Sequence, residues 1–178
     1  MDASSSPPAP FPSATVRVVD VYPYRMAGGR APEFLLVRRA PGIVYAGQWR
    51  MVGGKVDAGE PAWRAALREL REETGLAPVR CWALPSVNHF YEWQRDTVAL
   101  VPAFAAEVDA DPRLDREHDA FAWLPAEAAA ARLAWPEQRR LVRLAADLLR
   151  RGAVPPELEI PPAAFPLVPP APAAGPIE

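Results

Sequence analysis

Apolar and polar positions alternate along several short stretches of this chain and repeat at helical spacing along two longer ones. Alternation rich in β-branched and aromatic residues predicts strands over residues 15–25, 33–39, 49–52, 79–84, 87–93, 97–108 and 121–124. Helical spacing predicts one helix over residues 61–74, with Gly75 just past its end, and a second over residues 136–151, which Gly152 ends. Strands on both sides of one helix, with a second helix closing the chain, indicate an α/β domain.

The two ends of the chain differ from its centre in composition. Residues 1–14 are rich in Pro, Ser and Ala, and residues 153–178 contain nine prolines. Such segments offer little apolar surface to bury, so we expect two disordered tails around one domain at residues 15–152. A docking role for the C-terminal tail stays open.

The predicted helix at residues 61–74 carries three carboxylates on one face. With Glu69 as the origin, Glu73 lies about 40° to one side and Glu72 about 60° to the other. The alternative is a solvated helix with mixed charges, which is the ordinary meaning of a charge run. Carboxylates this close repel one another unless a cation binds them, and hard divalent cations with bound phosphates are their usual partners.

Charge, cysteine content and the lack of long apolar stretches limit the partners and the cellular location that we expect. The formal net charge of −2 makes long nucleic acid an unexpected partner. Cys81 is the only cysteine and lies in an apolar run, which favours a core position. We see no secretory signal and no stretch apolar enough to span a membrane, so we expect a cytoplasmic protein without a membrane partner.

The spacing around the three carboxylates forms a longer pattern. Gly54 is followed after five residues by Glu60, after seven more by Arg68-Glu69-Leu70, and then by Glu72-Glu73 and Gly75-Leu76. This segment resembles the signature of the Nudix hydrolases at every specified position, and residues 15–151 resemble the family more loosely. The resemblance implies a Nudix-type α/β/α sandwich with a mixed central sheet. It also implies Mg²⁺- or Mn²⁺-assisted hydrolysis of a nucleoside diphosphate linked to another group.

The resemblance also assigns roles to residues of the signature. Glu69, Glu72 and Glu73 are the expected metal ligands, with the backbone carbonyl of Gly54 beside them. We expect Arg68 to pair with Glu72 or another of these carboxylates and hold it in position. Glu60 is expected to brace the start of the helix, where negative charge is favourable.

The general base has two candidates. Glu117 precedes His118 and, a few residues later, Trp123-Leu124, a sequence similar to that of many relatives. We therefore expect Glu117 to act as metal ligand or base, with Glu69 as the competing base. The alternative for Glu117 is a solvated loop charge.

Four further residues are expected to bind the substrate. Arg39, Arg50 and Lys55 lie near the glycine loop and could contact phosphates, and Tyr91 could stack on the leaving group. Aromatic residues at strand spacing are more often core residues, so the stacking role competes with that interpretation.

Residues 85–140 carry the only sequence information on the substrate. Asn88 to Glu92, then Glu117-His118 and Trp135 to Arg140, look like the nucleoside triphosphate pyrophosphohydrolases of the dATP or dihydroneopterin triphosphate type, which release pyrophosphate. A dinucleoside polyphosphate or nucleotide-sugar hydrolase is the alternative, and a non-catalytic nucleotide sensor is an alternative of another class. The expected partner is a small nucleotide or polyphosphate, and a homodimer stays open.

Overall fold

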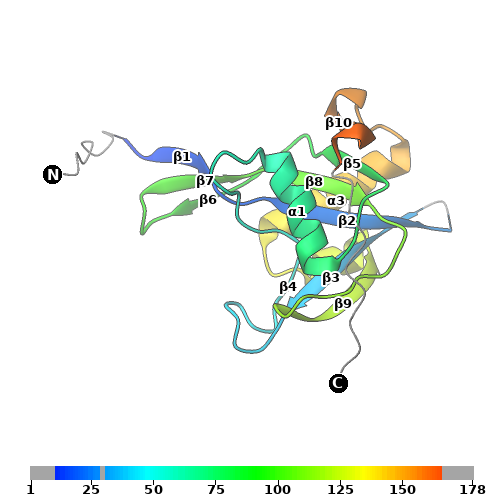
Figure 1. The fold of residues 1–178 in the computed structure, drawn as a ribbon, viewed down its shortest axis with the longest axis horizontal. Coiled ribbons are helices and arrows are strands. Elements are labelled where there is room, and N and C mark those ends of the chain that lie inside the picture. The colour runs from blue at the N-terminus through cyan, green and yellow to red at the C-terminus, as the bar shows by residue number, and fades with distance from the viewer. Residues whose placement is uncertain (1–10, 29–30, 166–178) are drawn as a thin grey trace, which may run out of the picture.

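The computed structural model describes residues 11–28 and 31–165, which form strands and helices of one mixed α/β domain (Figure 1). The strands are β1 (Ser13–Val16), β2 (Asp20–Ala27), β3 (Ala31–Arg39), β4 (Trp49–Arg50), β5 (Arg80–Ala83), β6 (Asn88–Glu92), β7 (Thr97–Val101), β8 (Ala103–Glu107), β9 (His118–Pro125) and β10 (Glu159–Ile160). The helices are α1 (Ala62–Thr74), α2 (Ala126–Arg132) and α3 (Pro136–Arg151), with 3-10 turns η1 (Pro156–Leu158) and η2 (Pro162–Ala164).

The strands form two sheets. The larger one has seven strands in the order β10-β5-β8-β2-β3-β4, with β9 paired to β3. Strands β2 and β8 run parallel and the other recorded pairs of this sheet are antiparallel, so the sheet is mixed. The smaller sheet, β1-β7-β6, extends away from the body of the molecule (Figure 1).

Alternating side chains along the central strands supply two separate cores, one on each face of the seven-stranded sheet. Tyr22 and Phe34 pack on the face covered by α2 and α3, whereas Val21 and Leu35 pack on the face covered by α1. Strand side chains alternate between faces, so one strand can serve both cores. The α/β/α sandwich with a mixed sheet is thereby confirmed (Figure 1).

Both principal helices lie where the periodicity predicts them. Helix α1 begins after Pro61, and Gly75 ends it in the left-handed conformation with φ 68°. Helix α3 spans Pro136–Arg151, and Gly152 ends it with φ 60°. Glycine takes this conformation at no steric cost, which explains why both helices stop there.

Two segments were predicted as continuous strands, and this prediction is wrong because each is divided into two strands. The segment 15–25 divides between β1 and β2, and the segment 97–108 divides at Pro102 between β7 and β8. In both cases the chain leaves the three-stranded sheet and enters the seven-stranded one. Pro102 has no N–H for a ladder, and its carbonyl instead accepts a hydrogen bond from the N–H of Asp20 at 3.0 Å. Strands β1 and β7 pair in the small sheet, and the strands that follow them, β2 and β8, pair in the large one.

Two further features differ from expectation. Helix α2 was not predicted, because its alanine-rich sequence has no clear apolar period. Strand β3 begins at Ala31, two residues before the strand predicted over residues 33–39. The helices within the described ranges include none that is long and apolar enough to cross a membrane.

Part of the predicted C-terminal tail is ordered. Strand β10 pairs with β5, Ile160 and Phe165 pack against the core under α1, and Arg80 forms an ion pair with Glu159. Val154 packs against the other core, so residues 153–165 contact the domain at several points. The tail predictions for residues 1–10 and 166–178 lie outside the described residues.

Candidate active site

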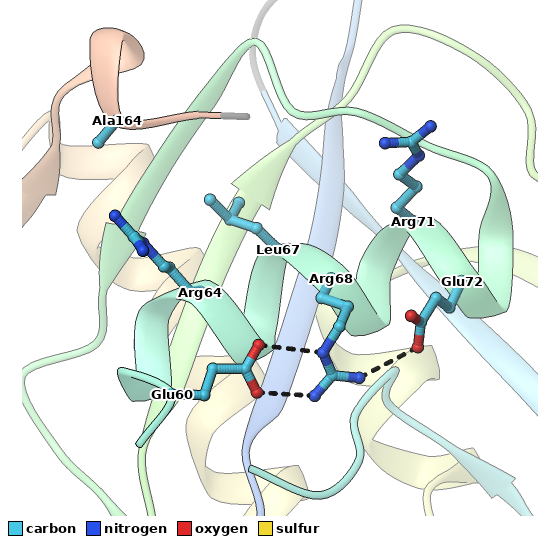
Figure 2. A pocket seen from close by; sticks show the side chains of 7 residues that line it. All are labelled: Glu60, Arg64, Leu67, Arg68, Arg71, Glu72 and Ala164. Carbon is cyan, nitrogen blue, oxygen red and sulfur yellow. Dashed lines mark hydrogen bonds and ion pairs between the residues drawn. The ribbon is translucent and has the colours of Figure 1, made fainter. Parts of the chain in front are cut away.

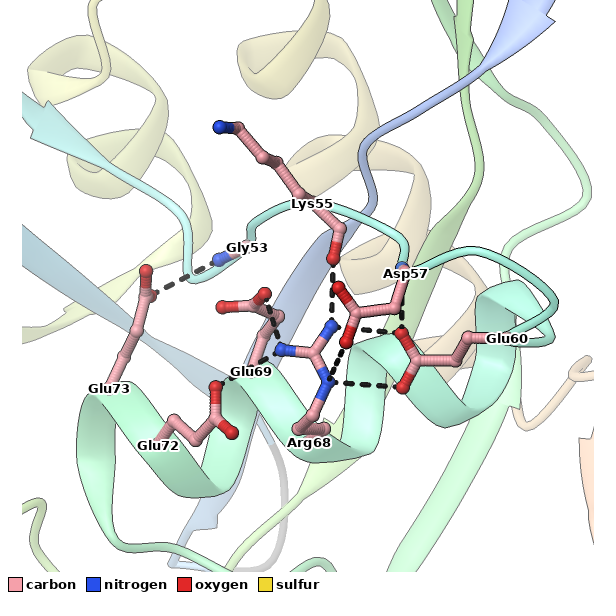
Figure 3. Close-up of polar contacts among 8 residues, drawn as sticks. All are labelled: Gly53, Lys55, Asp57, Glu60, Arg68, Glu69, Glu72 and Glu73. Atoms are coloured by element: carbon pink, nitrogen blue, oxygen red, sulfur yellow. Dashed lines mark hydrogen bonds and ion pairs between the residues drawn. The ribbon is translucent and has the colours of Figure 1, made fainter.

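Helix α1 presents one face to the core and another to a glycine loop. Ala66, Leu67 and Leu70 are buried against the sheet, whereas Glu69 and Glu73 face the loop that follows β4 (Figure 3). Glu73 is only 6% exposed, although it is charged in its ordinary state. Burial of a carboxylate is unfavourable unless a donor or a cation accompanies it, so this position is unlike a solvated surface charge.

The glycine loop lies directly against these carboxylates. The N–H of Gly53 donates to Oε2 of Glu73 at 3.2 Å. A Cβ atom on Gly54 would lie 2.3 Å from Cδ of Glu69, so a side chain at this position would displace that carboxylate. The carbonyl of Gly54 accepts a hydrogen bond from Val19 at 2.9 Å, which fixes the loop to the chain before β2. A carbonyl oxygen has a second lone pair, so Gly54 keeps capacity for a metal.

Arg68 joins the carboxylates of the helix to the loop (Figure 3). Its Nε and Nη2 atoms donate to the two oxygens of Glu60 at 3.0 and 2.9 Å, and Nη2 also donates to the carbonyl of Lys55 at 2.8 Å. Nη1 donates to Glu69 at 2.8 Å and to Glu72 at 3.0 Å. A planar guanidinium can hold several acceptors at fixed angles, so Arg68 fixes Glu60, Glu69 and Glu72 relative to one another.

The buried carboxylate of Glu73 and the partly buried one of Glu69 both have raised pKa values. Burial raises the pKa of Glu73 to about 8, against the opposing effects of Arg50 and the Gly53 N–H. Burial also raises the pKa of Glu69, while Arg68 opposes that rise. The Arg68 guanidinium, by contrast, holds the pKa of Glu60 below its usual range. Glu60 is therefore an ion-paired brace, whereas Glu73 and Glu69 lack full compensation for their charge.

The donor set suits a hard divalent cation, because it consists of carboxylate oxygens beside a carbonyl. Within residues 11–28 and 31–165, however, no three His, Cys, Asp or Glu side chains already converge on one point. Nη1 of Arg68 holds both Glu69 and Glu72, and Gly53 holds Glu73. Each of these contacts uses one oxygen of a carboxylate, so a cation could bind to the remaining oxygens while Arg68 stays in place.

Glu117 lies in a second cluster, at the start of β9. Its carboxylate accepts a hydrogen bond from Nη1 of Arg39 at 2.7 Å, and this pairing lowers the pKa of Glu117. Two predicted site residues thus meet each other. Among the contacts of the described residues, Glu117 makes none to Glu69, Glu72 or Glu73.

Asp115 connects this second cluster to α1. Its N–H donates to the carbonyl of Glu73 at 3.1 Å, and its Oδ1 accepts from the N–H of Glu117 at 3.1 Å and lies 2.9 Å from Nδ1 of His118. His118 is buried, and desolvation lowers its pKa. Sequence reasoning missed Asp115, because nothing in its local pattern separates it from the neighbouring charges.

A cavity of about 510 Å³ opens beside the glycine loop, between the small sheet and the start of α3. Gly54 and Arg50 line it together with Phe90 and Trp135. Arg50 also acts electrostatically on Glu73. Arg50, which the sequence predicts to contact phosphates, therefore lies between the carboxylates and an open cavity.

Lys55 and Tyr91 are not brought to this cavity. The Lys55 side chain points away from the carboxylates, and only its carbonyl joins their network (Figure 3). Tyr91 is exposed and donates to Asp96, since it faces the opposite side of β6 from Phe90. The aromatic residue that lines the cavity from β6 is Phe90.

A second cavity, of about 600 Å³, lies on the outer side of α1. Arg64, Leu67 and Ala164 line it together with Glu60, Arg68, Arg71 and Glu72 (Figure 2). Figure 2 shows that the Arg64 and Arg71 side chains project from the helix at its two ends. This cavity shares Glu60, Arg68 and Glu72 with the carboxylate cluster, but Gly53 and Gly54 are not among the residues that line it.

Comparison with known proteins agrees with this geometry. The family model for the NUDIX domain matches residues 14–145. An octanoyltransferase of Myxococcus xanthus is 39% identical over 151 residues, which are 77% of this chain and 38% of that protein. A bis(5'-nucleosyl)-tetraphosphatase (asymmetrical) of Mus musculus is 34% identical over 101 residues, covering 54% of this chain and 67% of that one.

The solved structure of a MutT protein from Methanosarcina mazei aligns with a TM-score of 0.61 and 26% identity, covering 78% of this chain and 97% of that one. The fold and the glycine loop against α1 define a Nudix-type domain, and the chain belongs to the Nudix hydrolase superfamily, as its signature predicted. The chain spans well under half the length of the octanoyltransferase that it matches.

Proposed function

We propose that this chain hydrolyses a phosphoanhydride bond of a nucleoside triphosphate-like substrate, of the dATP or dihydroneopterin triphosphate type, and releases pyrophosphate. The observation that carries the proposal is the contact of the Gly53-Gly54 loop with Glu69 and Glu73, beside a cavity that Arg50 shares. Polyphosphates carry clustered negative charge, and such a site can neutralise that charge and place a water for attack.

Mg²⁺ is the proposed cofactor, with Mn²⁺ as its substitute. Glu69, Glu72 and Glu73 would hold it with the Gly54 carbonyl, and it would supply charge neutralisation for the phosphates. Arg68 positions Glu69 and Glu72, and the proposal gives Arg50, which lines the cavity, the role of contacting the substrate phosphates. A cytoplasmic location stays a prediction.

For the general base we favour Glu69. Burial raises the pKa of Glu69, which makes it the stronger base, whereas the ion pair with Arg39 lowers the pKa of Glu117. Catalytic contacts often tighten only when substrate binds, so Glu117 stays the competing candidate. Comparing Glu69→Gln with Glu117→Gln decides between them, because only loss of the true base should remove the alkaline rise of the pH–rate profile.

A dinucleoside polyphosphate is the second candidate substrate. The tetraphosphatase of Mus musculus, which is named for such a substrate, supports it over 54% of the chain. A screen of nucleoside triphosphates, dihydroneopterin triphosphate, nucleotide sugars and dinucleoside polyphosphates, with products read by mass, separates the candidates. Pyrophosphate and a monophosphate support the first proposal. Exclusive turnover of dinucleoside polyphosphates would replace it, and no turnover of any compound would favour a nucleotide sensor.

A further inference from the structure

The segment between β8 and β9 is attached to the C-terminal end of α1. The N–H of Arg113 donates to the carbonyl of Thr74 at 2.8 Å. Two residues further on, the N–H of Asp115 donates to the carbonyl of Glu73 at 3.1 Å. Carbonyls in the last turn of a helix have no partner within the helix, so this segment satisfies two of them from outside. The segment therefore leads to β9 from a fixed point beside the carboxylate cluster.

The Asp115 side chain fixes the turn that follows. Its Oδ1 accepts from the N–H of Glu117 at 3.1 Å and lies 2.9 Å from Nδ1 of His118. An aspartate that bonds the backbone two residues ahead stabilises a tight turn. The carbonyl of Glu117 accepts from the N–H of Ala40 at 2.8 Å. Both backbone groups of Glu117 are thereby held, which determines the direction in which its side chain leaves the turn.

The Glu117 carboxylate holds Arg39 in turn. Nη1 of Arg39 donates to Oε2 of Glu117 at 2.7 Å, and Nε donates to the carbonyl of Val44 at 3.3 Å. The Arg39 side chain is only 11% exposed. A guanidinium has five N–H donors, and within residues 11–28 and 31–165 these two hydrogen bonds are the ones that it makes. Most of its donors are therefore left for an anion, on a cation whose orientation is fixed.

Arg39 faces the same side of the sheet as the carboxylate cluster. Val37 belongs to the core under α1, and Arg39 lies two positions further along β3. Side chains two positions apart on a strand point to the same face. Arg50, which acts electrostatically on Glu73, is paired with Val37 and shares that face. Both arginines therefore face the side of the sheet that α1 and its carboxylates cover.

We propose that Asp115 is a positioning residue for substrate binding, which acts through Glu117 to hold the Arg39 guanidinium toward the substrate phosphates. The inference rests on the proposed function for the identity of these phosphates, but the recognition step needs neither metal nor hydrolysis. It gives Glu117 the role of orienting Arg39, in place of the roles of general base and metal ligand.

The test is equilibrium binding of inorganic tripolyphosphate by calorimetry, with EDTA present so that neither metal nor turnover contributes. Asp115→Ala should weaken binding about tenfold, because Arg39 loses its fixed orientation. Removal of a carboxylate would by itself favour an anion, so weaker binding cannot be a plain effect of charge. Equal or tighter binding by Asp115→Ala, or no binding of tripolyphosphate by the wild type, would overturn the proposal.

Two matched variants separate the hydrogen bond from the charge. Asp115→Asn keeps an oxygen that can accept from the Glu117 N–H, so it should bind at least as tightly as the wild type. Asp119→Ala removes the same charge from β9, where Asp119 pairs with Arg38 at 2.8 Å, and it should not weaken binding. Weakening by either variant to the level of Asp115→Ala would contradict the positioning role.

A double-mutant cycle tests the route through Arg39. Arg39→Ala should weaken binding of tripolyphosphate about tenfold or more, and Asp115→Ala should have no further effect in that background. Additive losses would show that Asp115 acts by another route and would overturn the proposal. If Asp115→Ala fails to fold, Glu117→Ala takes its place in the cycle with the same expected outcome.

The kinetics of the same variants separate this inference from the proposed function. In hydrolysis, Asp115→Ala should raise KM about tenfold and change kcat little, because the lost contact binds substrate and transition state alike. A chain that hydrolyses nothing but shows the expected differences in tripolyphosphate affinity would sustain the role of Asp115 and remove the proposed hydrolysis. Hydrolysis with equal affinity in all variants would do the reverse.

Discussion

The substitution Gly54→Ala tests the contact between the glycine loop and α1. A Cβ atom there would lie 2.3 Å from Cδ and 2.4 Å from each oxygen of Glu69, so this carboxylate must retreat by about 1 Å to reach ordinary contact. Glu69 is the far end of a flexible side chain, so the fold can absorb that movement. A displacement of this size at a catalytic group costs on the order of 100-fold in rate.

We therefore expect Gly54→Ala to lower kcat/KM about 100-fold with little change in Tm. The assay is the initial rate of Mg²⁺-dependent hydrolysis of the best substrate from the screen, with the Tm measured by calorimetry on the same samples.

Two neighbouring glycines supply the controls. Gly59 has a φ of 77° and open space around its Cβ position, so Gly59→Ala should cost about 1 kcal/mol through backbone strain and leave the rate unchanged. That cost corresponds to roughly 2–4 °C in Tm for a chain of this length. Gly53→Ala should be the most destabilising of the three, because its Cβ would lie 2.2 Å from the backbone oxygen of Val19.

The account of the loop predicts opposite outcomes for Gly54→Ala and Gly59→Ala. A wild-type rate in Gly54→Ala, with an unchanged Tm, would refute the claim that Glu69 must sit against this loop. A rate loss that merely follows a fall in Tm, in both variants, would refute it equally.

The remaining predictions concern Arg68, Asp20 and Cys81. Arg68→Lys should lower kcat by about tenfold or more, because one ammonium cannot hold Glu60 and the α1 carboxylates together. Arg64→Lys, on the outer side of the helix, should leave kcat unchanged. Equal effects of the two substitutions on kcat would contradict this role of Arg68. Burial raises the pKa of Asp20, so its contribution to stability is present below its unfolded pKa of about 3.9 and is lost as pH rises through the folded value. The Tm of Asp20→Asn relative to wild type should therefore rise between pH 4 and pH 8, and calorimetry showing a constant difference would count against it. Burial raises the pKa of the Cys81 thiol to about 12, so a disulfide reagent at pH 8 should label it only after denaturation, and rapid labelling of the native chain would show that Cys81 is accessible.

The parts of the fold that could be predicted are those that local patterns determine. Helix α1 has an apolar stripe and ends at Gly75, and α3 has the same two signals with Gly152. The change of sheet at Pro102 depends on β1 and β7 pairing away from the main body, which no local pattern records. Residues 153–165 contact the domain through Val154, Ile160 and Phe165 among others, which their high proline content does not reveal.

Some contacts of the site could likewise be predicted from local sequence, and others depend on the fold. The expected neighbours of Arg68 are one helical turn or one loop away, and the structure brings Glu60, Glu69 and Glu72 to it. Asp20 and Asn88 meet only because β2 continues beside the small sheet, across 68 positions of sequence. Tyr91 and Phe90 differ by one position on β6, and only the register of that strand determines that Phe90 faces the cavity.

The central claim is that the carboxylates of α1, set against the glycine loop, form a divalent-cation site for phosphoanhydride hydrolysis. Its most direct test compares wild type and Glu73→Gln for the rate of Mg²⁺-dependent release of pyrophosphate from the best nucleoside triphosphate, at a pH above 8 where Glu73 is ionised. The account predicts that the variant keeps its fold, measured by an unchanged or higher Tm, because glutamine removes a buried charge at that pH. It also predicts that the variant loses nearly all turnover. Equal rates in the two proteins would contradict the account.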